Sequence, residues 1–192
     1  MKFACLAAVT MFAALTGCAT TDSQRGDFLS ALTPLCGQAY GGRIVSAPVA
    51  ADEVFAGKPL VMHVATCTAD AVRIPFHVGD DHSRTWVLTR TPAGLRLKHD
   101  HRHRDGSEDR VTQYGGDATT PPDAERQVFP ADGFTKDLLQ REGNAAGVDN
   151  VWAVEHRPGL FAYELRRPGR FFRVEFDLAR PVATPAAPWG SD

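Results

Sequence analysis

The sequence predicts a mainly β protein, folded as a single antiparallel up-and-down β-barrel. Three observations support this prediction. Apolar and polar residues alternate along much of the chain after Lys58, and short turn sequences such as Pro92-Ala93-Gly94 and Pro168-Gly169 separate the alternating segments. Only two segments have apolar residues at helical spacing. Strands joined by short connections pair antiparallel, and a sheet that closes on itself has no exposed edge. A two-sheet β-sandwich is the alternative fold.

The two helices are predicted at the start of the domain and in its second half. The first is a short amphipathic helix within residues 26–35, loosened at its end by Pro34. The second is an inserted helix near 133–142, with Asp132 as its N-cap, Leu138 and Leu139 facing inward, and Gly143 ending it.

The strands are predicted from alternation and from turns. After a glycine-marked entry strand that follows Cys36, we expect strands at 60–67, 72–78, 85–91, 95–103, 109–114, 125–129, 151–156, 161–165 and 172–178. The last two face each other across Pro168-Gly169 and form the clearest hairpin.

The segment Leu95–His103 alternates strictly and carries the most informative pattern of the chain. One side has two leucines followed by His99, His101 and His103, which we call the histidine row. The other side has only charged residues: Arg96, Lys98, Asp100 and Arg102. Because the charged side is expected to face water, the histidine row is expected to point into the molecule.

An inward histidine row next to aromatic residues predicts a ligand site inside the barrel. The expected ligand-binding residues are Trp86, Leu97, His99, His101, His103, Tyr114, Trp152 and Tyr163. The simpler interpretation is a polar row without a ligand, in which each histidine is hydrogen-bonded to Thr85, Thr112, Tyr114 or water.

The histidine row also predicts a metal site, with zinc as the expected ion. Adjacent members on one strand face are about 6.6 Å apart, so a pair can share a zinc ion. His99 and His103 would be about 13 Å apart, so at most two of His99, His101 and His103 bind, and a third ligand must come from elsewhere. This arrangement would suit a zinc-dependent hydrolase.

Other catalytic motifs are absent from the sequence. There is no Gly-x-Ser-x-Gly, His-Glu-x-x-His or phosphate-binding glycine loop. We therefore favour a binding protein over an enzyme. An envelope protein with an interaction or structural role and no pocket is the third hypothesis, and it predicts a large exposed apolar patch.

The amino end predicts the compartment. Lys2 precedes an apolar run from Phe3 to Leu15, and the run ends in Leu15-Thr16-Gly17-Cys18. This order resembles the signal peptide and lipobox of bacterial lipoproteins. The resemblance implies that residues 1–17 are removed, that Cys18 carries fatty acyl chains such as palmitate, and that 18–25 is a tether. Ala19 after the cysteine implies the outer membrane, facing the periplasm.

In such an oxidising compartment Cys36 and Cys67 are expected to form a disulfide, worth roughly 3–4 kcal/mol in the chain-entropy model. The barrel domain is expected to span 26–178. Residues 179–192 are rich in proline and alanine and are expected to form a disordered tail.

The entry to the domain carries a loose family motif. Leu32-x-x-Leu35-x-Gly37-x-x-Tyr40-x-Gly42, followed by β-meanders, resembles the calycin group of lipocalins, fatty-acid-binding proteins and nitrobindin-like barrels. The resemblance implies a barrel that opens with a short helix and ends in a hairpin. It implies no role for any particular residue.

The charge balance argues against nucleic acid as a partner. The chain has 21 Lys and Arg residues against 23 Asp and Glu residues, so no general attraction to a polyanion exists. Acidic residues interrupt the local cluster of Arg166, Arg167, Arg170 and Arg173. We expect that cluster to be a solvated face of a hairpin.

Overall fold

The protein folds into one nearly closed antiparallel β-barrel. The computed structural model describes residues 27–191. The strands are β1 (Ala39–Ile44), β2 (Leu60–His63), β3 (Thr66–Cys67), β4 (Ala71–Val78), β5 (Asp81–Thr91), β6 (Gly94–His101), β7 (Tyr114–Asp117), β8 (Arg126–Pro130), β9 (Val151–Arg157), β10 (Leu160–Arg167) and β11 (Arg170–Val182).

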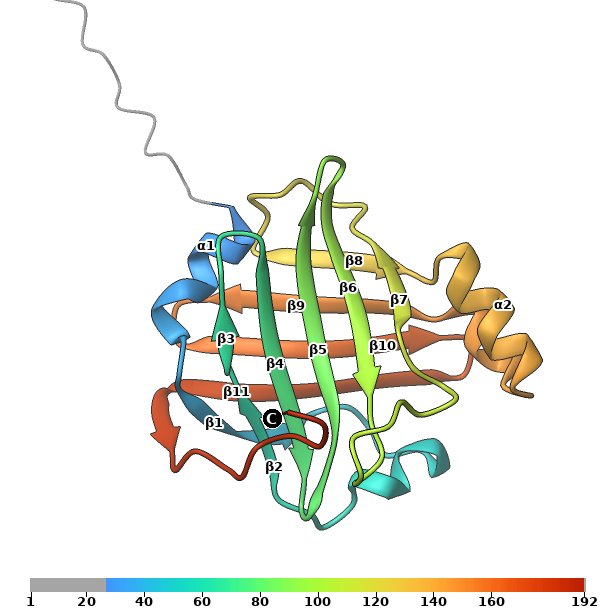
Figure 1. Cartoon of the computed structure of the whole chain (residues 1–192), viewed down its shortest axis with the longest axis horizontal. Coiled ribbons are helices and arrows are strands. Elements are labelled where there is room, and N and C mark those ends of the chain that lie inside the picture. The colour runs from blue at the N-terminus through green and yellow to red at the C-terminus, as the bar shows by residue number, and fades with distance from the viewer. Residues whose placement is uncertain (1–26, 192) are drawn as a thin grey trace, which may run out of the picture.

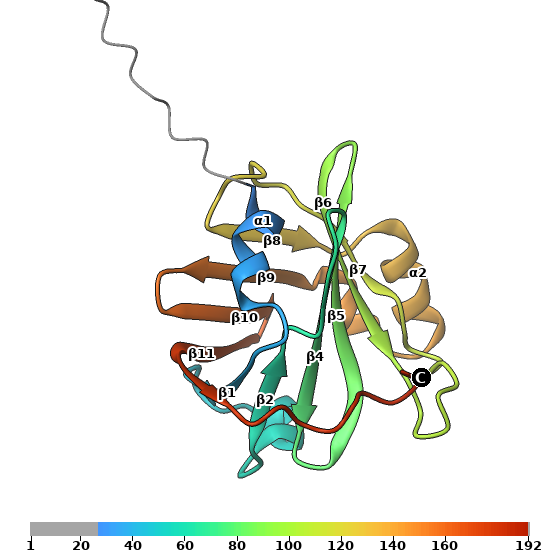
Figure 2. The same ribbon diagram turned by 60° about the vertical axis from the view of Figure 1, so that its left-hand side comes forward.

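Ten of these strands follow one path, in the order β7-β6-β5-β4-β2-β1-β11-β10-β9-β8, and β3 pairs with β4 at its side. Figure 1 shows β4, β5 and β6 crossing in front of β8 to β11, and Figure 2 shows the same two layers from the side. The predicted antiparallel barrel is confirmed, and the sandwich alternative is not adopted.

The barrel closes where β7 meets the end of β8. The Asp132 N–H donates to the Gly115 carbonyl at 3.0 Å, and the Thr119 N–H donates to the Val128 carbonyl at 2.9 Å. The Thr135 hydroxyl also donates to the Gly115 carbonyl and accepts from the Gly115 N–H. We call this contact the seam. Backbone groups that would otherwise be exposed at two sheet edges are thus satisfied.

The core occupies most of the inside of the barrel because most inward residues of the strands are apolar or aromatic. Trp86 on β5 stacks on Phe76 of β4 and on Tyr163 of β10, with ring centroids 4.7 and 4.3 Å apart. In the β5–β6 pair, Trp86 lies opposite His99 and Leu88 opposite Leu97. The predicted β10–β11 hairpin is confirmed, with Arg167 opposite Arg170 at its turn.

Both predicted helices are present. The helix α1 (Phe28–Leu32) buries Phe28, Leu29 and Leu32 at one end of the barrel and continues into a 3-10 turn, η1 (Thr33–Leu35). The helix α2 (Gly133–Arg141) begins at Asp132, whose carboxylate accepts from the Thr135 N–H at 2.8 Å. Two further 3-10 turns are η2 (Ala50–Phe55) and η3 (Ala145–Asp149). No helix within residues 27–191 is both long and apolar enough to cross a membrane.

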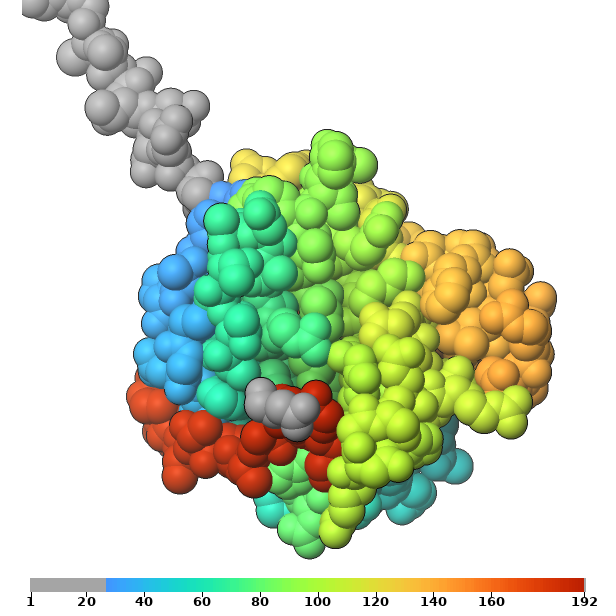
Figure 3. Space-filling model, viewed as in Figure 1, coloured from blue at the N-terminus to red at the C-terminus, as the bar shows by residue number. Residues whose placement is uncertain are grey.

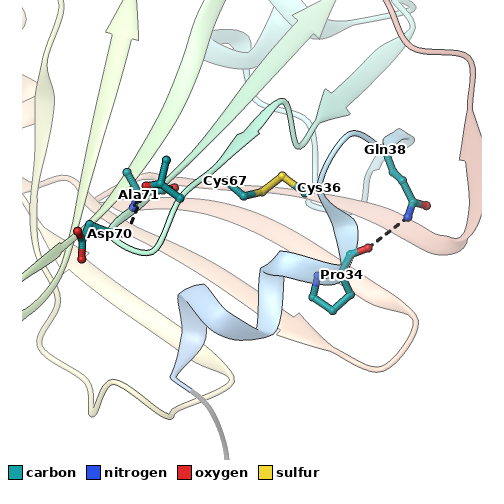
Figure 4. The surroundings of a disulfide bond; sticks show 7 residues. Pro34, Cys36, Gln38, Cys67, Asp70 and Ala71 are labelled. Atoms are coloured by element: carbon teal, nitrogen blue, oxygen red, sulfur yellow. Dashed lines mark hydrogen bonds between the residues drawn. A yellow bond between two sulfur atoms is a disulfide. The ribbon is translucent and has the colours of Figure 1, made fainter.

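A disulfide joins the chain after η1 to the short strand β3. Cys36 and Cys67 are bonded, with their Cα atoms 6.1 Å apart (Figure 4). The Gln38 side-chain amide donates to the Pro34 carbonyl at 3.2 Å beside it. The predicted disulfide is confirmed. It closes a loop between residues 31 positions apart, which restricts the unfolded chain.

The carboxyl end is more ordered than its composition indicates. Strand β11 continues to Val182, past the expected domain boundary at 178. The following residues cross the outer face of β4 to β6 (Figure 3), where the Trp189 N–H donates to the His82 carbonyl at 3.0 Å. The Arg104 guanidinium lies 5.5 Å from the centre of the Trp189 ring. Strand pairing to Val182 and the contacts of Trp189 therefore hold a segment whose composition predicts a disordered tail.

Candidate ligand-binding site

The barrel contains a cavity of about 320 Å³ that opens at the end opposite α1. The residues at its opening lie where β5 and β9 begin and where β10 ends, whereas α1 contacts the other ends of these strands. The cavity is lined by Phe55, Phe76, Arg84, Trp86, His99, His101, Asp109, Val111, Tyr114, Leu139, Asn144, Asn150, Trp152, Tyr163, Leu165, Arg167, Arg170 and Phe172. The cavity reaches the surface at Asn144, a lining residue that is exposed.

His99 lies at the inner end of the cavity and is only 2% exposed. Its Nδ1 is 3.0 Å from the Tyr114 carbonyl, and its Nε2 is 2.8 Å from the Tyr163 hydroxyl. Because a carbonyl oxygen only accepts, Nδ1 carries the proton, and Nε2 accepts from Tyr163. Burial, with a smaller effect of the neighbouring His101 charge, lowers the pKa of His99 to about 3. The ring is therefore neutral at pH 7.

His101 and Tyr114 form a second polar pair, closer to the opening. The Tyr114 hydroxyl is 3.0 Å from His101 Nε2. Burial, then the Arg84 charge, lowers the pKa of His101 to about 4, and burial raises the pKa of Tyr114 to about 12. Burial also raises the pKa of Tyr163. These histidine and tyrosine side chains are thus uncharged at neutral pH.

The prediction of three inward histidines is wrong for His103. The strand β6 ends at His101, and the chain then keeps only the isolated bridge between Arg102 and Glu108. Beyond the rim of the barrel no interior exists, so alternation no longer buries a side chain. His103 is exposed in the turn, where its backbone N–H donates to the Ser107 carbonyl at 2.8 Å.

The assumption that the charged side of this strand faces water fails at Asp100. Its side chain is on the outer face as expected, yet it is only 5% exposed. Arg73 and Arg102 hold its two carboxylate oxygens at 2.8 and 2.9 Å.

The structure brings six of the predicted ligand-binding residues together around the cavity: Trp86, His99, His101, Tyr114, Trp152 and Tyr163. Leu97 is fully buried in the core and does not line the cavity. It lies two residues before His99 on β6, farther from the opening and closer to the α1 end of the barrel. His103 does not reach the cavity. The hydrogen bonds of His99 and His101 with Tyr114 agree with the simpler interpretation of a satisfied polar row.

The predicted metal site does not form in the described part of the chain. No group of three or more His, Cys, Asp or Glu side chains there could hold a metal ion. Both ring nitrogens of His99 already have partners, and His103 lies outside the barrel. A neutral imidazole whose two nitrogens are both engaged offers no lone pair to zinc.

Sequence reasoning missed the charged residues of the cavity. Arg167 and Arg170 were expected on a solvated hairpin face, but they line the opening, and Arg84 joins them from β5. Arg173 of the same cluster is instead held among Glu155, Glu164 and Glu175. Alternation could have found the first two, since Arg167 is two residues after Leu165 and Arg170 is two before Phe172.

Comparisons of the chain with protein-family models, with curated protein sequences and with solved structures gave no significant match. The fold and the chemistry of the cavity are therefore the basis for assigning a function.

Proposed function

We propose that the protein is a lipid-anchored envelope protein whose barrel binds a small organic ligand in its interior. The observation that carries this proposal is the cavity of about 320 Å³, which lies at the lower end of the range for small-molecule sites. Its wall combines aromatic side chains with groups that can form hydrogen bonds, as small-molecule sites do. The proposed anchor rests on the Leu15-Thr16-Gly17-Cys18 motif, which lies outside the described residues.

The hydrogen-bonding capacity inside the cavity also supports binding. Tyr163 donates its only hydroxyl proton to His99, but its oxygen keeps acceptor capacity. Asn144 and Asn150 add amide groups near the opening, and the buried Asn150 Oδ1 atom has no hydrogen-bond partner among residues 27–191. A buried polar atom without a partner costs free energy that a ligand or a water molecule would recover.

A substitution that fills the cavity should weaken binding of a neutral aromatic probe. Val111→Trp places a large ring at a half-buried position of the cavity wall. We expect this variant to bind N-phenyl-1-naphthylamine at least about tenfold more weakly, a change of about 1.4 kcal/mol. Because each variant adds a tryptophan, the fluorescence of the naphthyl group excited directly measures its affinity. In the parent, energy transfer from tryptophan locates the bound probe, in the Trp189→Phe background because Trp189 lies outside the barrel.

The matched control is Val45→Trp, which adds the same ring at an exposed position away from the cavity. It should bind the probe as the parent does. Equal affinity of the Val111 and Val45 variants, or no energy transfer in the parent, would contradict interior binding.

The anchor makes a separate prediction. Cells that express the full chain and are fed an alkyne-labelled palmitate should incorporate the label, and Cys18→Ser should abolish labelling and release the protein from the membrane fraction. Cys5→Ser, within the apolar run, should leave both unchanged. Labelling that persists in the Cys18 variant would refute lipidation at this cysteine.

The rival functions have less support. The zinc hydrolase needs ligands that the described residues do not assemble. A protein with only an interaction role predicts a large apolar patch, whereas the exposed large apolar side chains of residues 27–191 are on four different segments: Val45, Val54, Phe134 and Val182.

A further inference from the structure

Three arginines project from the inner face of the barrel at the open end of the cavity. Arg84 precedes Trp86 by two residues, and in the β5–β6 pair it lies opposite His101. Arg167 and Arg170 end β10 and begin β11, directly opposite each other. All three line the cavity. We call them the arginine rim.

The arginine rim is only partly neutralised by the protein. Arg84 pairs with Asp81 at 2.5 Å, and Arg170 donates two hydrogen bonds to one oxygen of Asp52, at 2.5 and 3.0 Å. These guanidinium side chains are 19% and 16% exposed, so water screens them weakly.

Arg167 is the least compensated member. Within residues 27–191, no carboxylate lies within ion-pair distance of Arg167. Its sequence neighbour Arg166 and its cross-strand partner Arg170 both form ion pairs. Like charges directly opposite on two strands destabilise a hairpin. Among the residues that the structure describes, Asp109 is the one acidic residue that lines the cavity, and its Oδ1 accepts from the Val111 N–H. Asp81, Asp52 and Asp109 thus accompany the three arginines, and Arg167 is the member that no carboxylate of residues 27–191 pairs.

The charge of the arginine rim acts inside the cavity. The positive charges of Arg84 and Arg170 partly offset the rise that burial causes in the pKa of both Tyr114 and Tyr163. Arg84 also contributes, after burial, to the lowered pKa of His101, whereas Asp109, Asp81 and Asp100 raise that pKa. The effects of Arg84 and Arg170 thus have the sign expected of arginines that favour negative charge in the cavity.

We propose that the ligand is an amphipathic organic anion, held with its oxyanion between Arg84, Arg167 and Arg170 and with its apolar body against Trp86, Trp152 and Tyr163. The proposal rests on the interior binding proposed above and adds the charge and orientation of the ligand. Arginine suits this role because its planar fork of donors matches the geometry of oxyanions. Arg84 and Arg170 retain N–H donors beyond those used by Asp81 and Asp52.

Two probes that share one skeleton test this proposal. 8-Anilinonaphthalene-1-sulfonate and N-phenyl-1-naphthylamine differ only in the sulfonate group. With the complete chain in the Trp189→Phe background, and with energy transfer from Trp86 and Trp152 as the readout, we expect the anionic probe to bind more tightly. Arg167→Ala should weaken the anionic probe about tenfold, or about 1.4 kcal/mol, and change the neutral probe less than about twofold.

Three comparison variants sharpen the test. Arg167→Lys should restore part of the affinity for the anion, and Arg167→Glu should weaken it further than alanine does. Arg157→Ala removes an exposed arginine at the α1 end of β9 and should change neither probe. An aliphatic carboxylate such as decanoate should displace the sulfonate probe, and Arg167→Ala should weaken this competition if carboxylates use the same site.

The outcomes separate this proposal from the one it rests on. If both probes bind but Arg167→Ala and Arg167→Glu leave the preference for the anion unchanged, the arginine rim does not recognise the ligand, while interior binding stands. If neither probe binds the parent, interior binding itself fails.

Discussion

Lowering the pH from 7 to 4 is expected to reduce the free energy of unfolding by about 6 kcal/mol through His99 and His101 alone. The unfolded chain protonates both residues as the pH falls through about 6.5. The folded protein keeps them neutral until the pH approaches about 4 for His101 and about 3 for His99. The unfolded state therefore binds more protons in this window, so stability falls as the pH falls.

Urea unfolding at several pH values measures this slope. His99→Asn should remove about half of it, because the variant loses the residue whose pKa burial lowers most. The control is Leu97→Val, a destabilising change at a fully buried position on the same strand that leaves both histidines in place. It should lower stability at every pH and keep the slope. Equal slopes in the His99 variant and the parent would show that this ring is not buried as a neutral group.

The second large loss of stability is expected when a side chain is introduced into the seam. A Cβ atom at Gly116 would lie 1.9 Å from the Pro130 carbonyl oxygen, which belongs to the strand that completes the barrel. The backbones of both β7 and β8 would have to move to relieve this contact. We expect Gly116→Ala to lower the free energy of unfolding by at least about 4 kcal/mol, or to prevent closure of the barrel.

The control for this prediction is Gly133→Ala at the start of α2, where a Cβ atom would meet nothing within 4 Å. It should change stability by less than about 1 kcal/mol. Chemical denaturation of both variants, together with the hydrogen-exchange rate of the Asp132 amide, tests the seam directly. A Gly116 variant as stable as the parent, with the Asp132 amide still protected, would mean that β7 and β8 do not close the barrel.

Much of the fold could be predicted because alternation and turns are local signals. The β10–β11 hairpin and α2 were both found this way, since Pro168-Gly169 and Asp132 act within a few residues of where they stand. The return strand expected at 109–114 begins only at Tyr114, because the chain bulges first at Gln113, which has a φ of 57°. That conformation is uncommon for a residue other than glycine, and no local sequence signal announces it.

The site was predicted only in part, because alternation says which face a residue is on but not where the barrel ends. The alternation was right for His99 and His101 and failed at His103, one step beyond the rim. The arginine rim was missed for the opposite reason. Arg167 and Arg170 continue the inner face, but a charged side chain predicts exposure, and the ion pair of Arg170 with Asp52 joins residues 118 positions apart. Such distant partners are not visible in sequence spacing.

The placement of α1 gives the barrel a direction with consequences for ligand exchange. The chain enters at the closed end, beside Phe28 and Leu32, while the arginine rim surrounds the other end. If residues before Asp27 fasten the protein to a bilayer, the attached end of the domain and the entrance of the cavity lie at opposite ends of the barrel. A ligand that enters at the end away from the bilayer would arrive as a dissolved molecule or be handed over by a soluble carrier. Extraction of the guest would depend on its solubility in water, which an ionised group raises.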